Sequence, residues 1–228
     1  MAGFLLLHGS GQNARCWERL GRLLEERGHR VLAPELPKHA TDWTLPDYAA
    51  HIAAMVPGSD TVAVAHSFSG VFLPLVAERA PVGHLVFLAA VIPEPGKSVR
   101  AQFLEDPGMF HPDWLEAGAR WFAGAPKEPL AREVLLHDCD EETLAWGLGV
   151  IEMFDTRHLV VEPAPFSAWP SVPTTSIVAT GDRTVTADWV RRTAQRVLGI
   201  ESVEIDAGHC PHVSKPEQVA AILHGLAA

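Results

Sequence analysis

The sequence has little cysteine, little positive charge and no long apolar run. Its three cysteines, Cys16, Cys139 and Cys210, are odd in number and widely spaced, which excludes the framework of a small disulfide-rich protein. We therefore expect a reducing, cytoplasmic location. The apolar run at residues 4–7 is too short for a signal peptide or a membrane helix, and no other run could cross a bilayer, so we expect no membrane partner.

Acidic residues outnumber basic ones. The chain has 18 Lys and Arg against 28 Asp and Glu, which gives a formal net charge of −10 at pH 7. It would repel a nucleic-acid backbone, and no basic run offsets this average, so nucleic acid is not an expected partner. The 228 residues, of which 47% are hydrophobic, are enough for one globular domain with a sizeable core. The oligomeric state is left open.

Short apolar runs with the character of strands alternate with helical patterns along most of the chain. The predicted strands are residues 4–8, 30–34, 61–65, 84–91, 174–180 and 202–206. The predicted helices are residues 17–27, 45–56, 71–80, 187–198 and 216–226. This alternation predicts the α/β class, with a doubly wound and mainly parallel sheet.

The alternation breaks between Pro93 and Pro170, where helical patterns and four Trp residues replace the strands. Residues 130–136 and 141–148 have the pattern of short helices. We interpret residues 94–170 as a helical cap inserted into a core formed by residues 1–93 and 171–228. A cap over the strand ends is where a small-molecule substrate would bind. The aromatic residues expected to line that pocket are Trp114, Trp121, Phe122 and Trp146.

Ser67 lies between a predicted strand and a predicted helix, with the small residues Ala65 and Ser69 two positions to either side. This pattern is typical of a nucleophile elbow, in which a tight turn raises the serine hydroxyl above the sheet. Asp182 and His209 follow in the chain order Ser, Asp, His. His209 would take the serine proton, and Asp182 would orient the imidazole and stabilise its charged form.

Other residues could supply this chemistry. Asp155, Asp188 and Asp206 are alternatives for the acid, but Asp182 directly follows a strand, where the acid loop belongs. Histidine and cysteine gather at residues 137–139 and 209–212, and neither spacing matches a zinc pattern. We therefore expect no metal and no cofactor.

At this point the residues resemble the α/β-hydrolase superfamily along essentially the full chain. The similarity rests on residues 8–11 (His-Gly-Ser-Gly), on the elbow at residues 65–70, on Asp182 and on residues 208–209 (Gly-His). Within the superfamily the chain resembles the group of plant methylesterases, hydroxynitrile lyases and bacterial pyrethroid hydrolases. Residues 28–31, 66–68 and 137–139 are characteristic of that group.

The resemblance implies a carboxylic ester hydrolase that acts on a small apolar or aromatic ester through an acyl-enzyme. It also implies an oxyanion hole formed by the backbone N–H groups of Ser10 and Phe68. We expect His8 to brace loops and His66 to be a packing residue. Cys139 and Cys210 could lie beside the pocket without acting as nucleophiles.

Other reactions stay open on the same triad. In hydroxynitrile lyases a Thr follows the first-motif His and a Lys follows the catalytic His, whereas this chain has Gly9 and Cys210. The missing cation disfavours a lyase, because departing cyanide needs positive charge. A C–C bond hydrolase, a thioesterase, a biosynthetic cyclase and a ligand receptor built on a hydrolase fold are the remaining alternatives.

Overall fold

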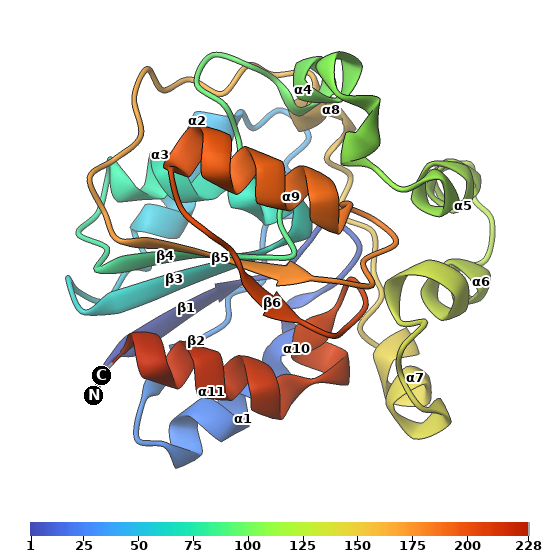
Figure 1. Ribbon diagram of the computed structural model, residues 1–228, viewed down its shortest axis with the longest axis horizontal. Coiled ribbons are helices and arrows are strands. Elements are labelled where there is room, and N and C mark those ends of the chain that lie inside the picture. The colour runs from blue at the N-terminus through green and yellow to red at the C-terminus, as the bar shows by residue number, and fades with distance from the viewer. Residues whose placement is uncertain (228) are drawn as a thin grey trace.

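A six-stranded parallel sheet lies at the centre of the computed structural model, which describes residues 1–227 (Figure 1). The strands are β1 (Gly3–Leu7), β2 (Arg30–Leu32), β3 (Thr61–His66), β4 (His84–Leu88), β5 (Thr174–Ala179) and β6 (Val203–Ile205). They lie in the order β2-β1-β3-β4-β5-β6, and each neighbouring pair is parallel. The predicted doubly wound α/β sheet is confirmed. Residue 228, the end of the predicted core, lies outside the described residues.

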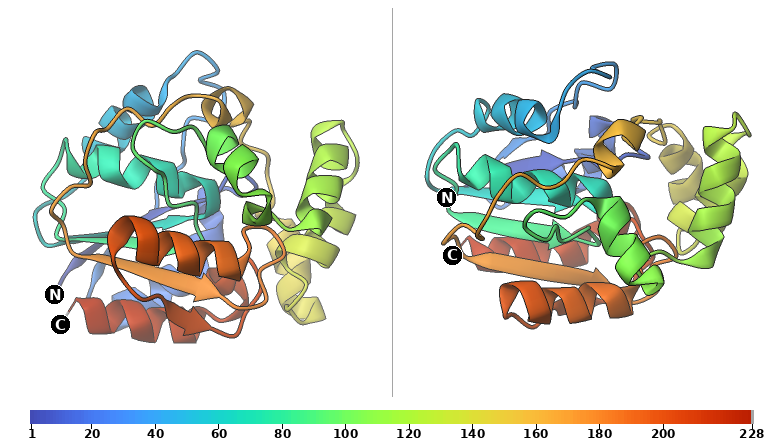
Figure 2. Two further views of the ribbon diagram at one scale, coloured as in Figure 1. Left: turned by 45° about the horizontal axis from the view of Figure 1, so that its top comes forward. Right: turned by 90° about the horizontal axis from the view of Figure 1, so that it is seen from above.

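Helices cover both faces of this sheet (Figures 1 and 2). On one face lie α1 (Glu18–Glu26) and α11 (Pro216–Leu226), and on the other lie α2 (Leu45–Ala53), α3 (Leu73–Ala77) and α9 (Ala187–Thr193). Shorter turns adjoin them: a 3₁₀ turn at Ala14–Trp17, α10 (Pro211–Ser214) and a π-helical turn at Ala194–Leu198. Within residues 1–227, no helix has the length and apolarity needed to cross a membrane.

The apolar core consists of two clusters, one on each face of the sheet. Successive strand side chains point to opposite faces, so each strand contributes to both clusters. In β1, Leu5 and Leu7 pack with α2, α3 and α9, whereas Phe4 and Leu6 pack with α1 and α11. This two-sided burial explains why the strands are continuous apolar runs in the sequence.

Local chemistry sets where two of the predicted helices begin. α2 starts at Leu45, because the Thr44 side chain accepts the Asp47 N–H and the Asp47 carboxylate accepts the Thr44 N–H. The helix predicted at 71–80 is shorter in the structure. A 3₁₀ turn occupies Ser67–Phe72, and α3 starts only at Leu73, which places Pro74 in the first turn where its missing N–H costs nothing.

Residues 94–170 contain several helices and no β-strand, and the structure describes all of them. The helices are α4 (Val99–Glu105), α5 (Pro112–Phe122), α6 (Lys127–Leu130), α7 (Glu141–Leu148) and α8 (Arg157–Val160), with a 3₁₀ turn at Pro107–Met109 and a π-helical turn at Ala131–Leu135. α5, α6 and α7 lie beyond the carboxyl ends of the strands (Figures 1 and 2). The division of the chain into a core and a separate cap stays a prediction.

Candidate active site

Ser67 stands at a strained turn directly after β3. Its φ of 57° lies in the left-handed region, which is costly for a residue with a side chain. The next elements hold it there, because the Ser67 carbonyl accepts the Val91 N–H at 3.0 Å. A Cβ at Gly70 would come within 2.1 Å of the Val91 carbonyl oxygen, so only glycine allows this close approach. The turn therefore has the geometry that the elbow pattern predicts.

A chain of hydrogen bonds joins the three predicted triad residues. His209 Nε2 lies 3.0 Å from Ser67 Oγ, and His209 Nδ1 lies 2.8 Å from Asp182 Oδ2. Because the carboxylate only accepts, the Nδ1–H donates to Asp182 and leaves Nε2 free to accept the serine proton. The other oxygen, Asp182 Oδ1, accepts the backbone N–H groups of Thr184 and Val185 at 2.6 and 3.1 Å. The carboxylate is thus oriented by its own loop.

The alternative acids lie elsewhere. Asp155 and Asp188 form ion pairs with nearby arginines at 2.6 and 2.7 Å, and Asp206 is exposed. Asp182 is buried and is the carboxylate that contacts the His209 ring.

A layer of uncharged histidines lies behind His209. The Nε2–H of His66 donates to the His209 backbone carbonyl at 2.8 Å, and the two rings are 4.6 Å apart. His212 lies 4.5 Å from the His66 ring and donates to Gln12 Oε1 at 3.1 Å. Burial lowers the pKa of His66 well below its ordinary value and lowers the pKa of His212 to about 3. Both rings are therefore neutral at pH 7.

This layer is no metal centre, since the described part of the chain holds no group of three His, Cys, Asp or Glu side chains that could bind an ion. His66 was predicted to be a packing residue, and it also makes a hydrogen bond to the backbone of the triad histidine.

His8 is fully buried and connects three loops. Its Nδ1–H donates to the Gly9 carbonyl at 3.0 Å, its Nε2 accepts the Leu36 N–H at 3.1 Å, and its carbonyl accepts the Ser69 hydroxyl. A Cβ at Gly9 would lie 2.9 Å from both His66 Nδ1 and Ser67 Cβ, so a threonine could not fit there without a shift of these groups.

Cys210, the residue after His209, carries no positive charge. Burial raises the pKa of its thiol well above the ordinary value, so the thiol stays protonated. It lies 3.5 Å from the side-chain nitrogen of Gln12. The positions that hold Thr and Lys in the resembled lyases thus provide neither a hydroxyl nor a cation.

A cavity of about 210 Å³ opens beside Ser67. Most of its walls are apolar side chains of α4, α5 and α8 and of the loops that precede α5 and follow β4 and β5. The lining residues are Ser10, Ser67, Phe68, Val91, Val99, Phe103, Phe110, Trp114, Leu115, Phe122, Thr156, Arg157, Val160, Thr184 and Val185. Ser10 and Phe68, the predicted oxyanion-hole residues, are both on this wall next to Ser67.

Two of the four predicted aromatic residues, Trp114 and Phe122, line the cavity. The other two do not: Trp121 packs near Gly11 in the core, and Trp146 lies under the guanidinium of Arg19 at 4.5 Å. Their side chains belong to the face of the helical segment that packs on the sheet layer. Aromatic character alone did not distinguish the two faces.

Several lining residues were missed by the sequence reasoning. Val99 and Phe103 on α4 are four residues apart, so they lie on the same helix face and helical spacing could have indicated them. Phe110 and Thr184 come from loops, for which the sequence contains no periodic signal.

A second, much smaller void of about 10 Å³ also borders the triad. Its walls include Ser67, His209 and Cys210, together with the loop at residues 9–12. The large cavity does not touch His209, whereas this void does. The reacting serine therefore lines both a large apolar space and a very small one.

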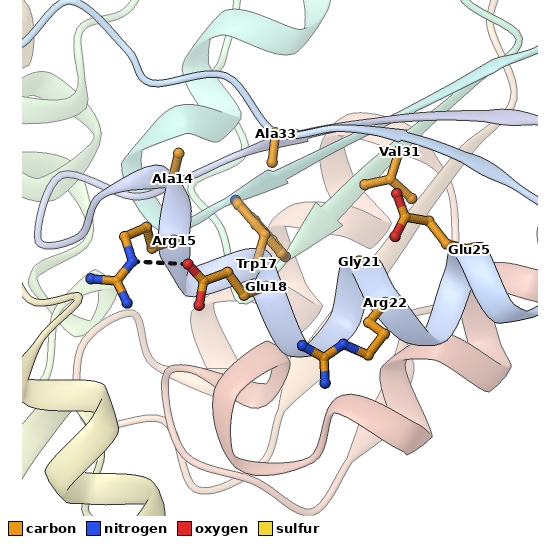
Figure 3. Close-up of a pocket in the computed structure, with 9 residues that line it drawn as sticks. All are labelled: Ala14, Arg15, Trp17, Glu18, Gly21, Arg22, Glu25, Val31 and Ala33. Atoms are coloured by element: carbon orange, nitrogen blue, oxygen red, sulfur yellow. Dashed lines mark hydrogen bonds and ion pairs between the residues drawn. The ribbon is translucent and has the colours of Figure 1, made fainter.

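A larger hollow than the one beside Ser67 lies elsewhere. It measures about 460 Å³ and lies between α1 and β2, with Trp17 and Val31 in its walls and an ion pair between Arg15 and Glu18 at its edge (Figure 3). No residue of the Ser67 site lines it, and its rim carries charges of both signs. It is therefore a surface groove separate from the candidate active site.

A doubly wound parallel sheet with an elbow serine after its third strand defines an α/β-hydrolase fold. The chain belongs to the alpha/beta hydrolase family, whose sequence pattern matches residues 4–222. The resemblance seen in the sequence is thereby confirmed, and the protein is a hydrolase by family.

Named relatives span nearly the whole chain. Methylesterase 7 of Arabidopsis thaliana is 28% identical over 98% of this chain and 95% of its own length. Norfluorocurarine synthase 1 of Strychnos nux-vomica is 28% identical over 98% of this chain and 94% of its own length. Among solved structures, a pyrethroid hydrolase from Sphingobium faniae JZ-2 matches with a TM-score of 0.77 at 24% identity, over 99% of this chain and 97% of that one.

Proposed function

We propose that this protein is a serine carboxylic ester hydrolase that works through an acyl-enzyme, with Ser67 as nucleophile, His209 as general base and Asp182 as the orienting acid. The observation that carries the proposal is the unbroken hydrogen-bond chain from Asp182 through His209 to Ser67 beside an apolar cavity. Relatives named methylesterase and esterase support it.

Acylation follows from the placement of these groups. Ser67 Oγ attacks the ester carbonyl carbon while His209 Nε2 takes the hydroxyl proton, and Asp182 stabilises the imidazolium that forms. The carbonyl oxygen becomes an oxyanion, which accepts hydrogen bonds from the backbone N–H groups of Phe68 and Ser10. Phe68 is in the first turn of a 3₁₀ segment, where N–H groups have no partner within the helix.

The two unequal spaces indicate which part of the ester lies where. His209 must hand its proton to the departing alcohol oxygen, so the alcohol lies on the His209 side, in the void of about 10 Å³. The acyl group then occupies the apolar cavity of about 210 Å³. This arrangement favours esters of a very small alcohol, such as methyl esters, with an apolar or aromatic acid. A water molecule releases the acid in the second half of the reaction.

We propose that residues 94–170 act as the cap of this site. α4, α5 and α8 supply most of the cavity wall, so they would exclude water from the acyl-enzyme and select the shape of the acid. The core would then be residues 1–93 and 171–228.

We keep a cytoplasmic location as part of the proposal. It rests on the three cysteines, which are all free thiols. Fractionation of cells that carry the tagged protein would test it, and recovery outside the cytoplasm would contradict it.

The alternative reactions would be recognised by the substrates that the protein turns over. Gly9 and Cys210 provide neither the hydroxyl nor the cation that cyanide release requires, so we expect little cleavage of mandelonitrile. A rate of cyanide release above the best ester rate would replace the esterase by a lyase. A thioesterase, a C–C hydrolase or a cyclase would show its preferred turnover in a wider substrate panel read by mass spectrometry.

A panel of methyl and p-nitrophenyl esters tests the main proposal, with Ser67→Ala as control. We expect turnover by the wild type, a loss of roughly three orders of magnitude or more in the variant, and an unchanged melting temperature. A fluorophosphonate should label Ser67. Saturable binding without turnover would indicate a receptor, and a Ser67→Ala protein that kept most of its activity would rule out the mechanism.

A further inference from the structure

The hydroxyl of Thr184 is an unusual polar group in this site. The residue is only 3% exposed, and among the described residues its Oγ1 has no hydrogen-bond partner. Buried side-chain oxygens are nearly always hydrogen-bonded, and one that is not calls for an explanation. Thr184 lines both the large acyl cavity and the small void beside His209, so its side chain stands where the two spaces meet at Ser67.

The backbone fixes this position. The Thr184 N–H donates to Asp182 Oδ1 at 2.6 Å, and its carbonyl accepts the His111 N–H at 2.9 Å. The side chain is therefore held at the junction and can change only by rotation about χ1. Its neighbours on the cavity wall, Val185 and Phe110, have no polar side-chain atom to pair with it.

The cavity wall also carries other polar groups. Ser67 is bonded to His209, and the guanidinium of Arg157 is held by Asp155 through two bonds of 2.6 and 2.8 Å. Arg157 is also largely exposed, so it lies towards solvent. Ser10 and Thr156 also carry hydroxyls on this wall, but of the three only Thr184 has an oxygen that is fully covered and without a partner.

We propose that the Thr184 hydroxyl binds an oxygen atom on the carbon next to the scissile carbonyl, and that the enzyme prefers esters of 2-hydroxy or 2-oxo acids. The inference rests on the proposed esterase function. A substrate carbonyl carbon at Ser67 places its neighbouring carbon at the start of the acyl cavity, where Thr184 lies. The Thr184 oxygen is covered in the present side-chain rotamer, so rotation about χ1 must turn it towards the cavity when substrate binds. The hydroxyl can then donate to an oxygen on that carbon, and it gives up no other partner in doing so.

The test compares methyl mandelate with methyl phenylacetate, which differ only in the 2-hydroxyl group. The readout is the ratio of the two kcat/KM values within each protein. We expect wild type to favour mandelate, and Thr184→Val, which keeps the shape and removes the hydroxyl, to lower the ratio about tenfold, the usual scale of one hydrogen bond beside a buried group. Thr184→Ser restores the hydroxyl and should restore most of the ratio.

Thr180→Val is the matched control, because it removes a hydroxyl from the same loop region that is already bonded to the Ile205 carbonyl and does not line the cavity. It should leave the ratio as in wild type. Melting temperatures give a second readout: Thr184→Val should be at least as stable as wild type, since its hydroxyl has no partner to lose.

The outcomes are distinguishable. An unchanged ratio in Thr184→Val, or a clear fall in its melting temperature, would overturn the role assigned to Thr184 while ester turnover still supported the esterase. If wild type hydrolysed neither ester nor any other member of the ester panel, the proposed function itself would fail.

Discussion

At the scale of single residues, the site depends on backbone positions that admit only one kind of side chain. Gly70 must be glycine because of the Val91 carbonyl, and Gly9 leaves no room for a Cβ beside His66. Ser67 accepts an unfavourable φ of 57° so that its hydroxyl can meet His209. Strain at the nucleophile is thus offset by close packing around it.

The first residue-scale prediction concerns Asp182→Asn. The amide oxygen can still accept the Thr184 and Val185 N–H groups, so the loop should keep its shape. The amide nitrogen would then face His209 and force the proton onto Nε2, the nitrogen that must take the serine proton. We expect kcat to fall by about four orders of magnitude with KM nearly unchanged, measured by steady-state ester hydrolysis.

Asp155→Asn and Asp206→Asn are the controls for this prediction. Asp155 is paired with Arg157 and Asp206 is exposed, so neither variant should change kcat by more than a few fold. If either proved far more damaging than Asp182→Asn, the acid would be wrongly assigned.

At the scale of secondary-structure elements, what the sequence could predict follows the strength of its periodic signals. All six strands were predicted, because a strand buried on both faces is a continuous apolar run. The order of Ser67, Asp182 and His209 could also be read directly, since each residue follows a strand at the same edge of the sheet. Both the apolar runs and the chain order of these residues can be read before any tertiary contact is known.

Other features depend on contacts that the sequence does not display. The elbow shortened the helix predicted at 71–80, because the tight turn and Pro74 delay the start of α3. α4, α5 and α8 were not predicted individually, and their cavity-facing residues could not be separated from core residues such as Trp121. The junction position of Thr184 arises only when two loops meet at Ser67.

The prediction at this scale concerns the cavity wall formed by α5. Phe122→Ala should enlarge the acyl cavity and shift preference towards bulkier acids, because the ring lines the cavity and not the triad. Trp146→Ala is the matched control: it also removes a large aromatic ring from the helical segment, but one that lies on Arg19 away from the cavity.

The measurement is kcat/KM for a series of methyl esters of increasing acid size. The order of preference should change in Phe122→Ala and stay as in wild type for Trp146→Ala. If the order of preference changed equally in both variants, the segment would affect activity through the stability of the fold and would not select substrates by their shape.

At the scale of the whole molecule, the parallel sheet brings distant segments to one edge, and the same packing buries several histidines. His66 and His212 are buried behind the triad, and His29 is held between the Ala2 N–H and His224, near the two chain ends. Burial lowers the pKa of each of these three below its ordinary value. The fold as a whole therefore resists protonation that an unfolded chain would accept.

This difference predicts a loss of stability in mild acid. Between pH 7 and pH 5 the unfolded chain gains protons on these histidines as pH falls through about 6.5, whereas the folded chain gains fewer, so the free energy of unfolding must fall. For a fully buried ring such as His212 the expected loss at pH 5 is roughly 2 kcal/mol. Paired carboxylates act at lower pH. Burial raises the pKa of Glu35, but its bonds from Lys38 and the Ala14 N–H outweigh burial and contribute to a pKa of about 2, so its stabilisation fades below about pH 4.5.

Urea unfolding at constant ionic strength, at pH 7, 6 and 5, measures this loss. His212→Gln keeps a side chain that can donate to Gln12 but cannot titrate. Between pH 7 and pH 5 its free energy of unfolding should therefore fall by roughly 2 kcal/mol less than that of wild type. His51→Gln, on the half-buried side of α2, is the control and should follow the wild-type curve. If wild type were equally stable at pH 7 and pH 5, the histidine layer behind His209 would have to be protonated in the folded protein, and its assignment as an uncharged support for the triad would be wrong.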